Sequence, residues 1–426
     1  MRTSILFRAL LAFQCFVISS SVLQDASGQQ PEQGVSGSSQ VAPLKSRAEN
    51  GEAQAQYLLG KAYTKGLGVA TDYAEASKWW TRAAEQGLPV AENELGYNYA
   101  HGRGIPQDYA HALYWFRAAA EQGLPAAEFN LASLYQKGTG VPQDYLLAAE
   151  WYRKAAQQGL PAAENNLAML YDLGLGVPKD PAQAFKWLSS AAERGNAGAQ
   201  YNLGEAYLFG RGVKKDYVQA LLWSRRAADQ GFSHAYNAIG YLYENGLGVP
   251  NNYTEAAKMY RKAADTGVGR AQAFLGCMYV AGKGVPQDFN EAAKWFSRAA
   301  EQGEAVGQGA LGWLYYSGHG VRRDWQKAAE WFRKGAEQGF AVAQVNLGYL
   351  FERGEGVPVD YPEAYKWYQL AAAGGCAPAR SAMMSLAKIM TPKQLLDSQS
   401  RLSTWQRRNA TLDVSNVIMV AIESHD

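Results

Sequence analysis

The residues that most suggest catalysis are a serine and a lysine near the C-terminus. Ser385 and Lys388 form the pattern Ser-x-x-Lys, in which a lysine helps to activate a serine nucleophile in β-lactam-reactive enzymes. The Ser-Asp-Asn and Lys-Thr-Gly elements that complete such a site are missing from the sequence. Because two fixed positions also coincide by chance, the sequence predicts no catalytic residue, and a weak β-lactam hydrolase using Ser385 remains an alternative.

Histidine and cysteine side chains form no metal-ligand set. No two histidines have the His-x-x-x-His spacing that places two ligands on one helix face. The histidines are His101, His111, His234, His319 and His425. Three cysteines are too few for a four-cysteine zinc site, and Cys277 and Cys376 lie too far apart in the sequence to suggest a local disulfide. We therefore predict no metal and no cofactor.

The composition limits the classes of partner and fold. Lys and Arg number 41 against 39 Asp and Glu, a net charge of +2, which is too small to support nucleic-acid binding. Apolar residues make up 47% of the chain and charged residues 19%, so a sizeable core is expected.

Paired glycines recur through the chain, and glycine pairs also occur in phosphate-binding loops. Nine Gly-x-Gly pairs, each followed by Val or Ile, are spaced by 36 residues. They begin at Gly66, Gly102, Gly138, Gly174, Gly210, Gly246, Gly282, Gly318 and Gly354. A phosphate-binding loop follows a strand and opens a helix, whereas no segment here alternates as a strand would. We therefore expect these loops to join helices.

Two further columns keep the same spacing of 36 residues. One consists of single glycines: Gly87, Gly123, Gly159, Gly195, Gly231, Gly267, Gly303, Gly339 and Gly375. The other is aromatic with one exception: Trp79, Trp115, Trp151, Trp187, Trp223, Met259, Trp295, Trp331 and Trp367. A fixed period of this length is typical of a solenoid, in which each unit buries its apolar face only against its neighbours.

The second unit shows how the sequence specifies two helices. Ala91, Leu95 and Tyr99 lie on one face of a first helix, which the Gly-x-Gly loop ends. Asp108 is placed to cap a second helix, which runs to Gly123. Each unit is thus predicted to be a helix-loop-helix hairpin.

This combination of hairpin, Gly-x-Gly-Val loop, Asp cap, Trp-bearing second helix and closing Ala-Ala-Glu-Gln-Gly resembles the Sel1-like repeat family. The resemblance implies an all-α fold, a right-handed α/α superhelical solenoid of about nine 36-residue repeats with a C-terminal capping helix. It also implies a protein-binding scaffold or adaptor, often exported in bacteria, and it names no partner.

The predicted organisation has five parts. Residues 1–28 have the basic, apolar and small-residue order of a signal peptide, and residues 29–47 have the composition of a flexible Gln/Ser/Gly-rich linker. Nine repeats occupy 48–376, and a partial tenth unit and the capping helix occupy 377–406. Residues 407–426 form a tail. Beyond the N-terminus no apolar run is long enough to span a membrane.

Two columns of the first helix vary where packing columns stay constant. The variable column reads Lys61, Tyr97, Ser133, Met169, Glu205, Tyr241, Cys277, Trp313 and Tyr349, and the adjacent column lies four residues earlier. Large aromatic side chains in a column outside the core are typical of recognition surfaces. The predicted partner-binding residues are Tyr57, Tyr97, Phe129, Tyr201, Tyr241, Trp313 and Tyr349. The alternative is that these rings pack against the second helix of the adjacent unit.

The sequence therefore predicts a non-catalytic scaffold that binds a protein or peptide along the concave face lined by the first helices. Its expected location is the periplasm or the outside of the cell, or the cytosol if the N-terminal segment is not cleaved. A regulator or assembly factor of an envelope process, such as polysaccharide secretion or signalling, is an alternative.

Overall fold

The computed structural model describes residues 38–420, with side-chain surroundings from Val41 to Arg408. Regular structure in this range consists of helices α2 to α22, and no strand occurs between residues 38 and 420. The prediction of an all-α repeat solenoid is confirmed. The predicted signal peptide lies outside the described residues.

Nine hairpins repeat along the chain with the predicted period. Their first helices are α3 (Ala53–Lys65), α5 (Pro89–His101), α7 (Pro125–Lys137), α9 (Pro161–Leu173), α11 (Ala197–Phe209), α13 (Ser233–Asn245), α15 (Gly269–Ala281), α17 (Ala305–Ser317) and α19 (Ala341–Arg353). Their second helices are α4 (Tyr73–Ala84), α6 (Tyr109–Glu121), α8 (Tyr145–Gln157), α10 (Pro181–Glu193), α12 (Tyr217–Asp229), α14 (Tyr253–Asp265), α16 (Phe289–Glu301), α18 (Trp325–Glu337) and α20 (Tyr361–Ala373).

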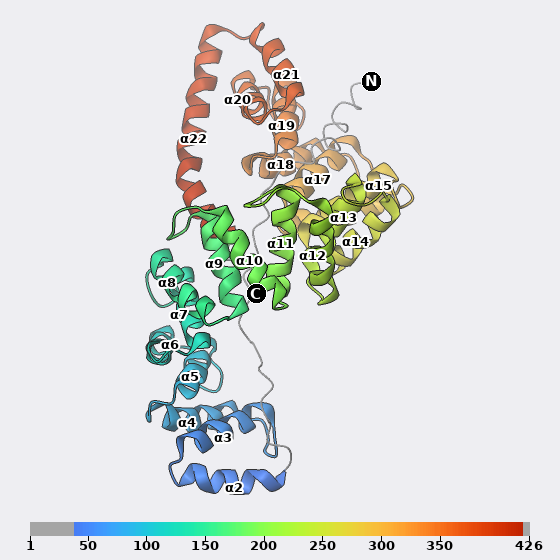
Figure 1. Cartoon of the computed structure of the whole chain (residues 1–426). Helices are drawn as coiled ribbons and strands as arrows, with labels where there is room; N and C mark the ends of the chain where they lie inside the picture. Colours follow the sequence, from blue (N-terminus) through green and yellow to red (C-terminus); the bar gives the residue numbers. More distant parts are fainter. Residues whose placement is uncertain (1–37, 421–426) are drawn as a thin grey trace. The chain divides into compact units, whose positions relative to one another are not determined.

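The described chain forms two compact units, which we call the N-terminal unit, up to Lys215, and the C-terminal unit, from Asp216. Within each unit, successive hairpins lie side by side in chain order (Figure 1). Each unit therefore has the one-dimensional architecture that a constant repeat predicts.

The predicted helix caps are present. The Asp108 carboxylate accepts hydrogen bonds from the backbone N–H of Ala110 at 2.9 Å and of His111 at 3.1 Å. The first glycine of the preceding loop, Gly102, ends α5 with φ of 65°, a left-handed conformation that favours glycine. These local signals set the hairpin boundaries.

The second glycine of each loop has a role between hairpins. A Cβ atom on Gly176 would lie 2.1 Å from the backbone carbonyl of Tyr145, the first residue of the second helix of the preceding repeat. A Cβ atom on Gly356 would likewise lie 2.2 Å from the carbonyl oxygen of Trp325. From the second repeat onward, the backbone of each loop therefore rests directly on the preceding hairpin, which leaves no room for a side chain.

Helix α2 (Ser38–Glu49) corrects the predicted linker, because residues 38–47 are helical. Val41, Leu44 and Ala48 are buried against Leu59 and Trp79 of the first hairpin. Their spacing of three and four residues is that of a helix face, which the polar composition of the segment obscures. Ala48 also accepts a hydrogen bond from Gln56, at 3.1 Å, through its carbonyl oxygen. Helix α2 thus covers the start of the repeat array.

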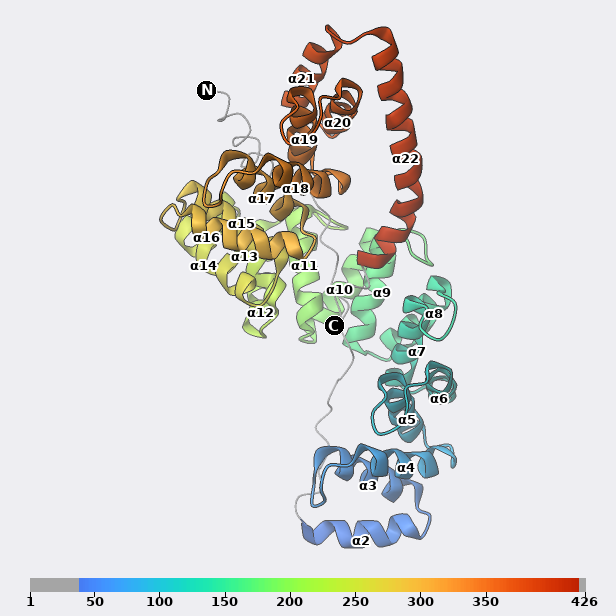
Figure 2. The ribbon, with the colours of Figure 1, turned by 180° about the vertical axis from the view of Figure 1, so that it is seen from behind.

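Two helices follow the ninth hairpin. Both α21 (Ala377–Ala387) and α22 (Pro392–Val420) pack on α20, and Figure 2 shows the chain reversing between them. Helix α22 continues beyond residue 406, where the sequence analysis places the start of the tail. Thr391 and Gln394 cap its first turn through reciprocal hydrogen bonds, including Thr391 N–H to Gln394 Oε1 at 2.8 Å.

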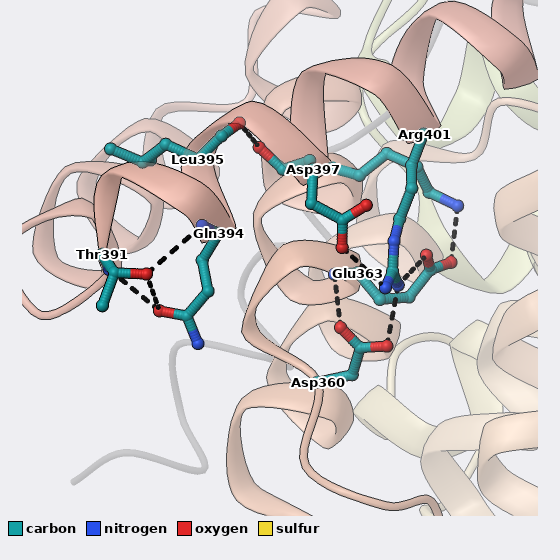
Figure 3. Close-up of polar contacts among 9 residues, drawn as sticks. Asp360, Glu363, Thr391, Gln394, Leu395, Asp397 and Arg401 are labelled. Atoms are coloured by element: carbon teal, nitrogen blue, oxygen red, sulfur yellow. Dashed lines mark hydrogen bonds and ion pairs between the residues drawn. The ribbon is translucent and has the colours of Figure 1, made fainter.

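Arg401 joins α22 to the N-terminal end of α20 (Figure 3). Its guanidinium lies 2.7 Å from Asp360, 3.2 Å from Glu363 and 2.9 Å from Asp397. Asp360 is itself the cap of α20. In earlier repeats, the loop of the next repeat covers this helix end, and no tenth loop follows α20. Arg401 therefore covers the end of α20 that a following loop would otherwise cover.

We expect Arg401→Ala to detach α22 and leave the hairpins folded, because it removes both ion pairs that join α22 to α20, those with Asp360 and Glu363. Amide hydrogen exchange should become at least about tenfold faster in the first four turns of α22 and stay unchanged in α19. Arg380→Ala, at an exposed position of α21, is the matched control. Unchanged protection of α22 would show that Arg401 does not hold it.

Candidate partner-binding face

The seven predicted partner-binding residues divide by burial. Four are buried, with exposed fractions of 6% for Tyr57, 2% for Phe129, 3% for Tyr201 and 8% for Trp313. Three are half-buried and present part of their rings at the surface: Tyr97, Tyr241 and Tyr349. The three half-buried rings all belong to the variable column, and three of the four buried rings belong to the column four residues earlier, so repeat position largely sets how much of a ring is accessible.

The buried members contact core side chains. Phe129 packs against Tyr152 of the second helix of its own repeat, with ring centroids 5.5 Å apart. Burial, with a smaller contribution from Glu94, raises the pKa of Tyr57 to about 12, so its hydroxyl stays neutral. Phe129 and Tyr201 leave too little surface for a partner to contact, and the half-buried rings carry the accessible part of the face.

The loops contribute a second set of side chains that the sequence analysis missed. In three repeats, the middle residue of the Gly-x-Gly loop contacts the variable-column residue of the same repeat. Arg103 lies 5.0 Å from the Tyr97 ring, and His319 stacks on Trp313 with centroids 5.4 Å apart and planes 5° apart. We call these middle residues the loop-centre column: Leu67, Arg103, Thr139, Leu175, Arg211, Leu247, Lys283, His319 and Glu355.

Arg211 provides the third example and links two repeats. Its guanidinium lies 3.3 Å from Glu205 in the variable column and 3.0 Å from Asp172 of the preceding repeat. The available signal was variation: the loop-centre residues differ in charge and size while both flanking glycines are constant. A position that packing leaves free to vary between two fixed glycines belongs to the surface.

The C-terminal unit concentrates aromatic side chains on this face. Phe289 lies 4.7 Å from the His319 ring, and Tyr316 meets Tyr349 edge to face at 6.3 Å. The Arg353 guanidinium lies 5.7 Å from the Tyr349 ring. Of the seven predicted residues, Trp313 and Tyr349 line the same crevice. Rings and guanidinium groups at this density are typical of binding hot spots.

The residues considered for catalysis or metal binding lie outside the candidate face or do not cluster. Ser385 and Lys388 are both exposed at the end of α21. Burial, with a smaller effect of Glu244, raises the pKa of the Cys277 thiol to about 12, so it remains protonated and weakly nucleophilic near neutral pH. Among residues 38–420, no His, Cys, Asp and Glu side chains gather as a metal-ligand cluster, and no helix is long and apolar enough to cross a membrane.

Comparisons with known proteins agree with the architecture. The Sel1 repeat model matches nine consecutive segments, from 53–88 to 341–376. A protective antigen from uropathogenic Escherichia coli is similar at 32% identity with a TM-score of 0.53, over 95% of this chain and 91% of that one. A Sel1 repeat protein from Oxalobacter formigenes is 33% identical with a TM-score of 0.55, over 81% of this chain and 99% of that one. No curated protein matches the chain.

Proposed function

Because the chain belongs to the Sel1 repeat family, we propose that it is a non-catalytic scaffold that binds a partner protein along the first helices of its repeats. In a solenoid of hairpins these helices offer an extended surface, the concave one of such arrays. The observation that carries the proposal is the pairing of the variable column with the loop-centre column, as at Tyr97 with Arg103. Two columns of varying residues on one face can determine which partner binds, while the constant packing columns keep the repeats folded.

The proposed contact residues are the accessible members of the predicted set. They are Tyr97, Tyr241 and Tyr349, with the exposed edge of Trp313, and the loop-centre side chains Arg103 and His319 join them. Tyr, Trp and Arg dominate the energy of protein interfaces because each buries a large area with little loss of conformational entropy.

We further propose that the protein is exported to the periplasm or beyond it. The order of basic, apolar and small residues in 1–28 supports this location. The relative at 32% identity is described as a protective antigen, which agrees with an exported protein. Regulation or assembly of an envelope process is a role that a scaffold in this compartment can perform.

Alanine variants of accessible rings test the proposal. We expect Tyr97→Ala and Tyr241→Ala each to weaken binding of the partner isolated with the wild-type protein by about tenfold, the effect of removing a hot-spot ring. The melting temperature should change little, because each ring is only half-buried. The dissociation constant and melting temperature of each purified variant give the answer.

Tyr114→Ala is the matched control, since Tyr114 is a 63% exposed tyrosine on the second helix of the repeat that contains Tyr97. It should leave binding unchanged. If Tyr114→Ala weakens binding and the first-helix variants do not, the binding face is on the second helices and the proposal is wrong.

A further inference from the structure

The crevice between the eighth and ninth repeats contains a polar group that the fold does not satisfy. Its lining includes Trp313 and Tyr316 of α17 and Asn346 and Tyr349 of α19. Asn346 is 3% exposed, and neither its Nδ2 nor its Oδ1 has a hydrogen-bond partner. The crevice in this conformation has no room for a water molecule. Two buried, unpaired amide atoms destabilise this part of the fold.

Equivalent asparagines elsewhere show what Asn346 lacks. Asn202 occupies the same repeat position four repeats earlier, and its Nδ2 donates to Oδ1 of Asn165 in the preceding repeat at 2.9 Å. Asn130 donates to Asn93 at the same distance, 2.9 Å. In the eighth repeat, the position equivalent to Asn165 is Gly309, which has no side chain to accept the bond. Asn346 is therefore a member of an inter-repeat pair whose second member is missing.

The chemistry of the unpaired group defines what would satisfy it. An asparagine amide presents one acceptor and two donors, and the C=O and N–H groups of an extended peptide segment are the complementary pair. Trp313 and Tyr349, one repeat apart, line the same crevice as Asn346, and aromatic rings favour contact with proline or aliphatic side chains. Free peptide groups of this kind are exposed on an extended segment and not on a folded helix.

We propose that this crevice binds one peptide group of an extended partner segment, with Asn346 hydrogen-bonded to its backbone and Trp313 and Tyr349 flanking its side chain. The inference rests on the proposed function and specifies its partner class. Opening requires the half-buried ring of Tyr349 to turn outward from its edge contact with Tyr316. The unpaired Asn346 favours this opening because solvent or a partner then satisfies its amide. The crevice is thus closed in the free protein and is completed by the segment that binds there.

Asn346→Leu separates a binding role from a packing defect. We select dodecapeptides from a random phage-displayed library on the full-length protein and measure the dissociation constants of synthesised peptides. The variant should raise the dissociation constant by at least about tenfold through loss of the backbone hydrogen bonds. Its melting temperature should stay equal or rise, because two unpaired polar atoms disappear. Asn346→Ala is a second variant, and alanine already occupies this repeat position at Ala238 and Ala310.

Asn202→Leu is the matched control, because it removes a paired asparagine at the same repeat position. It should lower the melting temperature and leave peptide binding unchanged. Peptide binding that is equal in the wild-type protein and both Asn346 variants would overturn the inference, and so would a library that yields no binding peptide. Both failures are distinct from failure of the proposed function, which the partner-binding measurements on Tyr97 and Tyr241 test separately.

Discussion

Replacing Gly176 by alanine is expected to destabilise the N-terminal unit by about 3 kcal/mol or more. The added Cβ would lie 2.1 Å from the carbonyl group of Tyr145, and backbone atoms cannot move aside without separating two hairpins. Overpacking of this kind commonly destabilises a fold by about 1–3 kcal/mol, and a contact with backbone is at the upper end. The measurement is chemical denaturation followed by helical circular dichroism.

Gly195→Ala is the control, because it separates the steric contact of an added methyl group from the backbone penalty of placing alanine at a left-handed position. Gly195 has φ of 87° against 66° for Gly176, and a Cβ on it would meet nothing within 4 Å. The control variant should therefore show only the backbone penalty, about 1 kcal/mol. Equal destabilisation by the two substitutions would mean that the loop does not dock on the preceding hairpin.

Replacing three buried glutamates together by glutamine is expected to raise the free energy of unfolding of the N-terminal unit by about 3 kcal/mol, or about 1 kcal/mol for each residue. Glu92, Glu128 and Glu164 lie at one repeat position and are 4%, 3% and 1% exposed. Five other repeats have glutamine there: Gln56, Gln200, Gln272, Gln308 and Gln344. Each of these glutamines donates to a carbonyl of the preceding helix, which a glutamate side chain cannot do when ionised.

The triple substitution should also change the pH dependence of stability. Burial raises the pKa of all three carboxyl groups, an effect that hydrogen bonds from Gln122, Gln158 and Ser190 and the ion pair of Glu164 with Arg194, at 3.6 Å, partly oppose. A raised pKa in the folded state means that ionisation disfavours folding above that pKa and that the penalty disappears as the pH falls through it. As the pH falls from 7 toward the ordinary pKa of a glutamate, the wild-type protein should therefore gain stability relative to the glutamine variant.

Thermal melts of both proteins across this range measure the difference, which should be largest near pH 7. A variant less stable than the wild-type protein at pH 7 would contradict the account. It would mean that the three carboxylates take part in favourable contacts beyond those seen in the fold.

The hairpins were predictable because their signals are local. A left-handed glycine ends each first helix and a side-chain oxygen of Asp or Asn caps each second helix, whatever lies in the next repeat. The docking of Gly176 on Tyr145 was not predictable, since a glycine that permits a turn and one that admits a neighbouring backbone look alike in sequence. Helix α2 was missed because Val41, Leu44 and Ala48 are its only buried apolar residues among polar ones.

The position of the candidate binding face stays a prediction. Sequence variation identified the two columns, and it did not show that the rings of the earlier column are buried. The accessibility of a ring follows largely from its repeat position, since Tyr97 belongs to the variable column and Phe129 to the column four residues earlier. The unpaired state of Asn346 emerges only when neighbouring repeats are placed together, because it arises from the missing side chain at Gly309 of the preceding repeat.

Site-specific photo-crosslinking in the producing cells tests the central claim most directly. A benzophenone side chain placed in turn at Tyr97, Tyr241 and Tyr349, and at Tyr114 as the second-helix control, reports which face a partner touches. The account predicts one partner protein crosslinked from the three first-helix positions and none from Tyr114. Crosslinks from Tyr114 without crosslinks from the first helices would contradict it.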